Sequence, residues 1–111
     1  MIELTVKQFV EASLPVPLFM EYPEDPPDSF VVLRKGDSGR DNFLDSAMIV
    51  ADSYGQSLLE AARLNELVKS ILDNLILLDS ICGSRRGGDY PAYDTTNKRH
   101  RYQAVQNLLH Y

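Results

Sequence analysis

The spacing of apolar and polar residues predicts two helices in this chain. Apolar positions recur at close to helical spacing over residues 4–14, and Pro15 and Pro17 end that pattern because proline disrupts a helix interior. A longer stripe of Leu, Ile, Val and Ala covers residues 56–75, with charged residues mostly off the stripe. Ser57 and Glu60 have the spacing of a capping box, in which the two side chains satisfy free amides of the first turn.

Shorter apolar runs predict strands. The apolar and aromatic runs 16–22 and 30–33 have strand length, and the Pro- and acid-rich segment 23–29 between them predicts a loop, so the unit is interpreted as hairpin-like. The Gly- and Asp-containing segment 34–42 predicts a second loop. Residues 43–53 lack clean alternation, which favours a strand covered on both faces, although a helix also fits them.

The last third of the chain leaves more than one interpretation open. Residues 76–82 either lengthen the second helix or begin a strand, and the polar, Gly-containing residues 84–97 predict a long loop. Residues 98–111 fit a strand or one helical face, and we favour the strand. The order α-β-β-β-α-β-β predicts a single α+β domain over residues 1–111. Its mainly antiparallel or mixed sheet of about four to five strands packs against the two helices.

Composition narrows the class of protein. The chain has 111 residues, of which 44% are hydrophobic and 24% charged, as in an average soluble globular domain. One cysteine and two histidines are too few for a disulfide framework or a usual four-ligand structural zinc site. The N-terminus lacks the pattern of a secretory signal, and no apolar run reaches the roughly 18 residues of a membrane-spanning helix. We therefore expect a soluble protein kept in a reducing cytoplasm.

The residues that could serve in catalysis or cofactor binding do not match the known motifs for either role. The glycines Gly83, Gly87 and Gly88 match neither a Walker A loop nor a Rossmann turn, and a flexible turn explains them. Neighbouring carboxylates fall in predicted loops, where solvated acids are the simpler interpretation. Cys82 fits a small buried residue, and His100 stands among cations that disfavour its protonation. We expect no enzymatic activity, cofactor, metal or small-molecule substrate.

Charge is unevenly distributed along the chain. The formal net charge is −5, but residues 1–80 carry −8 and residues 81–111 carry +3. Cations next to tyrosines can grip nucleic acid or dock on an acidic protein, and the overall acidity favours protein contact. If the last two strands pair, the cations meet at one end of the sheet. We predict that an acidic neighbour is contacted there. The candidate interface residues are Arg85, Arg86, Arg99, Arg101, Tyr90 and Tyr93.

Four stretches of the chain carry a resemblance to a known family. Residues 26–33 (PPDSFVVL), 45–47 (DSA), 53–62 (SYGQSLLEAA) and 99–105 (RHRYQAV) together resemble the small tail-terminator, or head-to-tail joining, proteins of long-tailed bacteriophages and prophages. The resemblance spans nearly the whole chain and rests on order and spacing. It contains no catalytic motif.

The resemblance implies a minor structural protein of the virion tail or neck, made in the bacterial host cytoplasm. In such families an α+β subunit forms a six-membered ring that caps the tail tube and docks on the head connector. The implied partners are further copies of the chain, the tail-tube protein, the head connector protein, and DNA that passes through the ring without sequence-specific binding.

Two alternatives remain open from the sequence. The first is another neck or connector component of a phage. The second, from a different class, is a small regulatory or nucleic-acid-binding domain that uses the basic segment 84–101.

Overall fold

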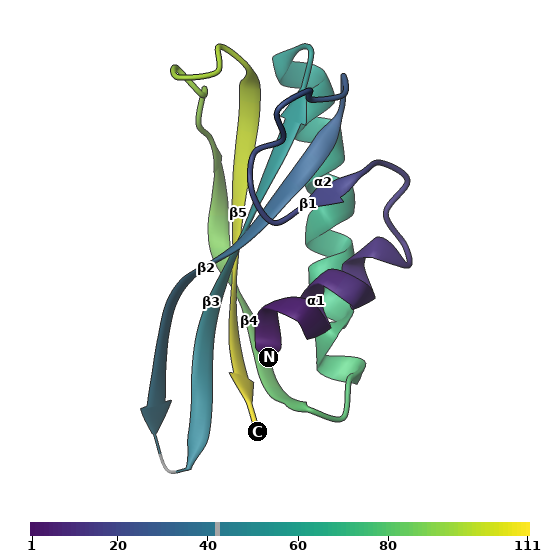
Figure 1. Cartoon of the computed structure of the whole chain (residues 1–111). Helices are drawn as coiled ribbons and strands as arrows, with labels where there is room; N and C mark the ends of the chain where they lie inside the picture. The colour runs from purple at the N-terminus through teal and green to yellow at the C-terminus, as the bar shows by residue number, and fades with distance from the viewer. Residues whose placement is uncertain (42) are drawn as a thin grey trace.

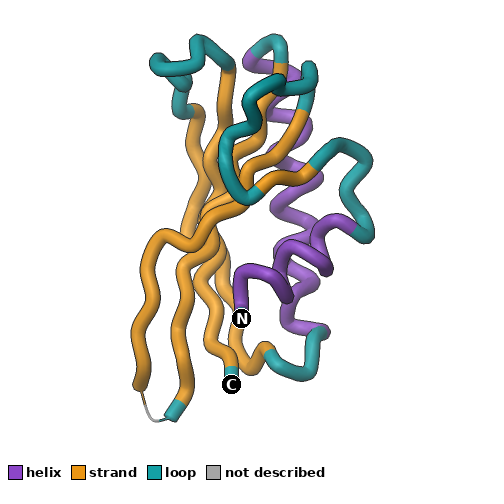
Figure 2. Tube along the Cα trace, in the orientation of Figure 1, coloured by secondary structure: helices purple, strands orange, loops and turns teal. Residues whose placement is uncertain are grey.

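Five strands form one sheet, and two helices pack on one of its faces (Figures 1 and 2). The computed structural model describes residues 1–41 and 43–111. In chain order the elements are α1 (Ile2–Glu11), β1 (Leu18–Phe19), β2 (Phe30–Asp41), β3 (Leu44–Gly55), α2 (Leu58–Asp73), the 3₁₀ helix η1 (Asn74–Leu77), β4 (Ile81–Pro91) and β5 (His100–His110). The predicted α+β class and element order are confirmed.

The strands lie in the order β1-β2-β3-β5-β4, so β3 is central and β1 and β4 are the two edges. All neighbouring strands are antiparallel except β1 and β2, which are parallel. The predicted hairpin-like unit of β1 and the start of β2 is therefore wrong. The true hairpin joins β2 to β3, because these two strands are linked by a tight connection whereas the longer segment 20–29 lets the chain return parallel.

The helix boundaries follow from local chemistry. Ser57 Oγ accepts a hydrogen bond from the Glu60 amide at 3.2 Å, and the Glu60 carboxylate accepts one from the Gln56 amide at 2.9 Å, which confirms the predicted cap of α2. Gly55 lets β3 meet this helix closely, since a Cβ there would lie 2.7 Å from the Ala61 nitrogen. No helix among the described residues is both long enough and apolar enough to span a bilayer.

The main core lies between the helices and the sheet, and a smaller cluster lies on the opposite face. The main core includes Val6, Val10, Leu33, Ile49, Ala51, Leu64, Val68, Leu72, Leu75 and Leu108. The smaller cluster consists of Phe30, Val32 and Tyr54, with Phe19 and Tyr22 packed against it. From residue 49 onward β3 is buried on both faces, which explains why it lacks alternation and confirms the strand over the helix.

Two predicted loops are strands. Residues 34–41 continue β2 and pair with β3, past a register shift at Gly36 between Lys35 and Asp37. Residue 42, also predicted in that loop, lies outside the described residues. The polarity of this segment reflects exposure, because its residues 34–40 are exposed although paired. The hydrophobic pattern that identifies a buried strand is therefore missing.

The predicted long loop 84–97 is also mostly wrong, because β4 extends to Pro91. This edge strand buries only Ile81, and its register shifts near Gly83 and Gly88 accommodate the glycines; Gly88 has a φ of 115°. Residues 76–82 split between the end of η1 and the start of β4. The favoured strand near the C-terminus is confirmed as β5.

Candidate protein interface

The structure separates the six predicted interface residues into two places. Four of them gather where β4 ends and β5 begins: Tyr90 and Arg101 lie on the strands, and Tyr93 and Arg99 lie in the short connection 92–99 between them. Arg85 lies midway along β4, opposite Asn107. The two groups of cations therefore do not meet at one end of the sheet. Because β4 is an edge strand, Arg85 and Tyr90 nevertheless lie on the same open border.

Arg86 is exposed but forms an ion pair with a residue of the same chain. Its guanidinium donates hydrogen bonds to Asp73 of α2, from Nε to both carboxylate oxygens at 3.0 Å and from Nη2 to Oδ2 at 2.6 Å. These bonds lower the pKa of the Asp73 carboxyl and raise that of Arg86. Its neighbour Arg85 is exposed and forms no ion pair within residues 1–41 and 43–111. Alternation explains the difference, since Arg86 points to the helical side and Arg85 to the other.

A polar seam joins the same edge strand to α2. Lys69 lies 2.8 Å from Glu66 and 3.1 Å from Asp89, and the Asn65 amide donates to Asp89 at 2.8 Å. The hydrogen bond from Lys69 lowers the pKa of Asp89, and the bonds to Glu66 and Asp89 raise the pKa of Lys69. Asn65 is almost fully buried. Asp89 is thus a structural partner of α2, where the sequence suggested a solvated loop acid.

Arg99 links the acidic segment 23–29 to the sheet through hydrogen bonds. Its Nη2 donates to the carbonyl oxygens of Asp28 at 2.6 Å and Pro27 at 3.3 Å. The guanidinium also lies 5.4 Å from the centre of the Phe30 ring, in a cation–π contact. The contacts of Arg99 are with backbone oxygens and an aromatic ring, so it stabilises the fold of this end of the molecule.

Arg101 belongs to a buried network around Asp94, which sequence reasoning did not identify. Tyr54 donates to Asp94 at 2.9 Å, and Arg101 donates to the Ala92 carbonyl at 2.8 Å and to the Tyr54 oxygen at 3.4 Å. The Asn97 side chain donates to the same carboxylate at 2.8 Å. The available signal was the spacing of Asp94 and Asn97, which is typical of a side-chain-stabilised turn.

The environment of this network shifts two pKa values in opposite directions. Burial raises the pKa of Tyr54 to about 12. Burial also opposes the charge of Asp94, but hydrogen bonds from Asn97 and Tyr54 outweigh it, and the pKa of Asp94 falls below its ordinary value. Three of the four candidate arginines thus have structural partners inside the chain. Arg85 and the half-exposed Tyr90 and Tyr93 keep side chains directed at solvent.

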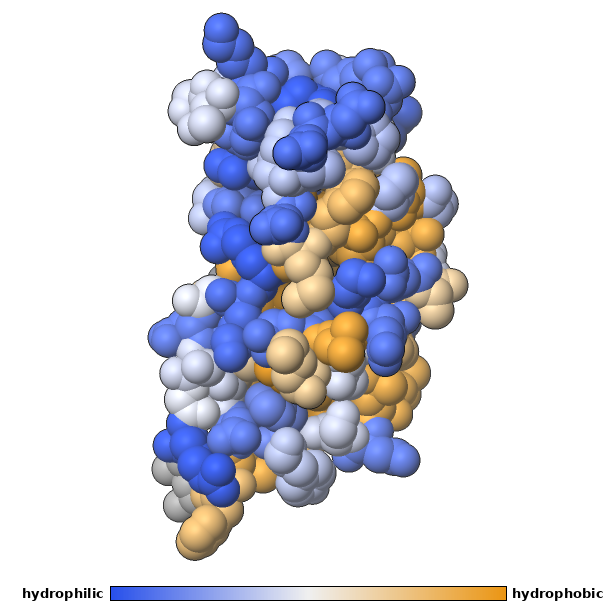
Figure 3. Space-filling model, viewed as in Figure 1, coloured by the Kyte–Doolittle hydropathy of each residue, from blue (hydrophilic) through white to orange (hydrophobic). Residues whose placement is uncertain are grey.

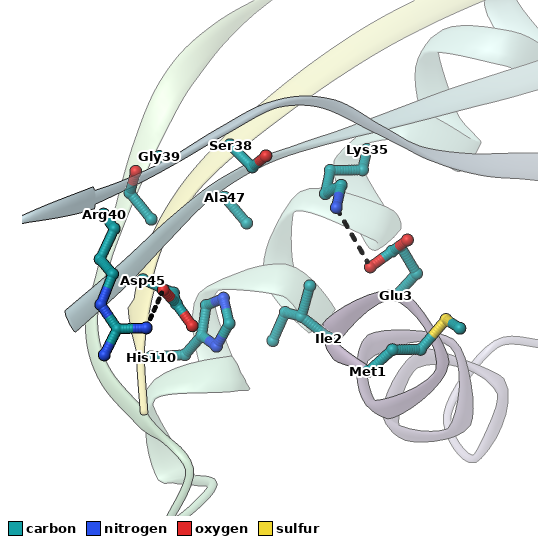
Figure 4. Close-up of a pocket in the computed structure, with 11 residues that line it drawn as sticks. Met1, Ile2, Glu3, Lys35, Ser38, Gly39, Arg40, Asp45, Ala47 and His110 are labelled. Atoms are coloured by element: carbon teal, nitrogen blue, oxygen red, sulfur yellow. Dashed lines mark ion pairs between the residues drawn. The ribbon is translucent and has the colours of Figure 1, made fainter. Parts of the chain in front are cut away.

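A cleft lies at the opposite end of the sheet, between the start of α1 and the far part of the hairpin (Figure 4). It has a volume of about 480 Å³, with Ile2 and Ala47 among its lining residues. Its charges are paired across short distances, since Lys35 lies 3.7 Å from Glu3 and Arg40 lies 3.6 Å from Asp45. Within the part of the chain that the structure describes, no group of three His, Cys, Asp or Glu residues could hold a metal ion.

A second cleft, of about 730 Å³, lies at the β1 edge and is lined by Lys7 and residues 18–24. Its apolar side chains include Phe19, Met20 and Tyr22, and exposed glutamates stand among them. On the face shown in Figure 3, hydrophilic residues dominate the upper end and apolar residues gather toward the helical side. The candidate interface therefore has two borders with different chemistry, one at each edge of the sheet.

No family model matches this chain, and no curated protein matches it. Among solved structures, the chain is similar to one in the virion of native gene transfer agent (GTA) particle, with a TM-score of 0.63 and 14% sequence identity. The match covers 95% of this chain and 90% of that chain. The two chains therefore share a fold over nearly their whole lengths.

Proposed function

We propose that this protein is a structural component of a phage-like virion, where copies form a ring that caps the tail tube and joins the tail to the head connector. The observation that carries this proposal is the fold shared, over nearly the whole length, with a chain of a gene transfer agent virion. The order and spacing of the resembling stretches in the sequence point to the same class of protein.

The arrangement of polar groups supports an assembly role without catalysis. In the cleft beside α1, the charged side chains Glu3, Lys35, Arg40 and Asp45 form simple ion pairs. Large stretches of β2 and β4 are exposed although they are paired in the sheet. Such surfaces suit contact with other proteins. The net charge of −5 suits a ring through which DNA passes without being held.

The second candidate is another neck or connector component of the same kind of particle, since the shared fold favours it equally. A nucleic-acid-binding role for segment 84–101 is less well supported. Arg86, Arg99 and Arg101 donate to partners within the chain, so few cations remain for phosphates.

The decisive experiment is electron microscopy of particles from the source phage or prophage after deletion of this gene, with a plasmid-borne copy as the control. DNA-filled heads beside unjoined tails of uncontrolled length are the expected result. Unjoined heads beside tails of normal length would assign the protein to another step of neck assembly. Joined particles of normal length would overturn a virion role, and salt-dependent DNA binding would then favour the nucleic-acid function.

A further inference from the structure

We propose that neighbouring copies in the ring join head to tail, with Arg85 and Tyr90 of one copy seated on the β1-edge cleft of the next. This inference rests on the proposed function and names the two surfaces that meet. The occupant of the cleft is a second copy of this chain.

The receiving surface is the cleft lined by Lys7 and residues 18–24. Its apolar lining can bind an aromatic ring, because Met20 is 42% exposed beside the partly buried Phe19 and Tyr22. Glu21 and Glu24 are exposed at this cleft and form no ion pair among the described residues. The charge of Lys7 is already matched by Glu11 at 2.9 Å. The cleft therefore combines an apolar lining with an uncompensated negative charge.

The inserting surface is the outer side of the β4 edge. Arg85 pairs with Asn107 and Tyr90 with Gln103 in the β4–β5 ladder. The register shift between Arg86 and Gly88 puts both side chains on the same face, away from the helix α2 that Arg86 and Asp89 contact. Tyr90 is 52% exposed, and Arg85 is exposed without an ion pair in residues 1–41 and 43–111. Tyrosine and arginine are, with tryptophan, the side chains enriched among the residues that contribute most to binding at protein interfaces. Their chemistry complements the apolar, acidic cleft.

The sheet topology makes this contact repeat in one direction. The strand order puts the cleft beside β1 at one edge and the anchors on β4 at the other edge. A contact between unlike surfaces is heterologous and generates a ring when its rotation closes. The segment after β1 carries Pro23, Pro26 and Pro27, which lack amide donors and so oppose strand addition. The side chains therefore carry the contact.

A charge swap tests the pairing in particles complemented by variant genes. Arg85→Glu and Glu24→Arg should each reduce the yield of joined particles by at least tenfold, and the double variant should restore much of it. Arg63→Glu is the matched control, because Arg63 is also exposed without an ion pair among the described residues but lies on α2. Circular dichroism of the purified variants checks that each folds. Normal yield for Arg85→Glu, or no restoration in the double variant, would overturn the pairing.

Cross-linking in purified particles tests the geometry directly. Cys82 is exposed and is first changed to Ser. Particles are then assembled with a mixture of molecules carrying Glu24→Cys and molecules carrying Arg85→Cys, purified, and treated with a short bismaleimide. We expect mixed dimers and few dimers of either variant with itself. Self-linked dimers alone, or no dimers in particles that contain the protein, would overturn this inference and leave the proposed function standing. Absence of the protein from joined particles would overturn the proposed function itself.

Discussion

The two halves of β2 have the same backbone pairing and opposite surroundings. Residues 30–33 are buried, with Val31 and Leu33 in the main core and Phe30 and Val32 in the cluster on the other face. Residues 34–40 are exposed, although they continue the same ladder with β3. Hydrogen bonding therefore builds the whole strand, whereas side-chain burial stabilises only its first half. The exposed half is available for contacts with other proteins.

The contrast between the two halves of β2 requires that the aromatic cluster around Phe30 contribute substantially to the free energy of unfolding. Phe30→Ala should lower the free energy of unfolding by about 4 kcal/mol, since a fully buried ring that stacks on Tyr54 at 4.6 Å is replaced by a cavity. Urea unfolding monitored by circular dichroism measures the loss. A change below about 1 kcal/mol would show that the outer face does not stabilise the fold.

The next largest effect concerns the exposed edge strand and its attachment to α2. Asp89→Ala should cost about 2 kcal/mol, because Lys69 loses a partner and the buried Asn65 amide loses its acceptor. Asp79→Ala is the control, since Asp79 is exposed and forms no ion pair in the described part of the chain. Equal unfolding midpoints for the two variants would contradict the role of the seam.

A smaller effect depends on pH. The folded pKa of Asp94 lies below its unfolded value of about 3.9, so its carboxylate stabilises the fold above that pH. This stabilisation is lost as the pH falls through the folded pKa. Asp94→Asn should therefore cost about 1 to 2 kcal/mol at pH 7 and progressively less below about pH 4. Thermal melting of the wild type and the variant across this pH range measures the difference in their stability. A difference that stays constant at all pH values would refute the stabilising role of the Asp94 carboxylate.

The smallest effect is expected at the hairpin tip. Phe43 is 89% exposed and has a φ of 67°, so its ring gains nothing from burial in this chain. Phe43→Ala should change the free energy of unfolding by no more than about 0.5 kcal/mol. The same substitution is thus expected to lower stability strongly at Phe30 and hardly at all at Phe43. A loss above 1 kcal/mol, measured by the same urea unfolding, would mean that the tip supports the fold.

The sequence predicted correctly those helices and strands whose buried faces leave a pattern of apolar residues. The stripe over residues 56–75 and the Ser57–Glu60 cap located α2, and the run 30–33 located the buried start of β2. It failed at residues 34–41 and 84–91, because exposed strands rich in Gly, Ser and Asp have the composition of loops. The candidate residues were identified by charge and by nearby tyrosines, which could not separate Arg85, turned to solvent, from Arg86, bonded to Asp73.

The sequence by itself determined the α+β class, the order of the elements and the −8 and +3 division of charge, because these depend on local spacing and composition. Only the tertiary structure decided which charges remain available. Strand order placed the cleft beside β1 and Arg85 on β4 at opposite edges, and packing drew Arg99 and Arg101 into bonds with residues distant in the chain. Those outcomes depend on long-range pairing, in which a shift of one residue turns every side chain to the other face.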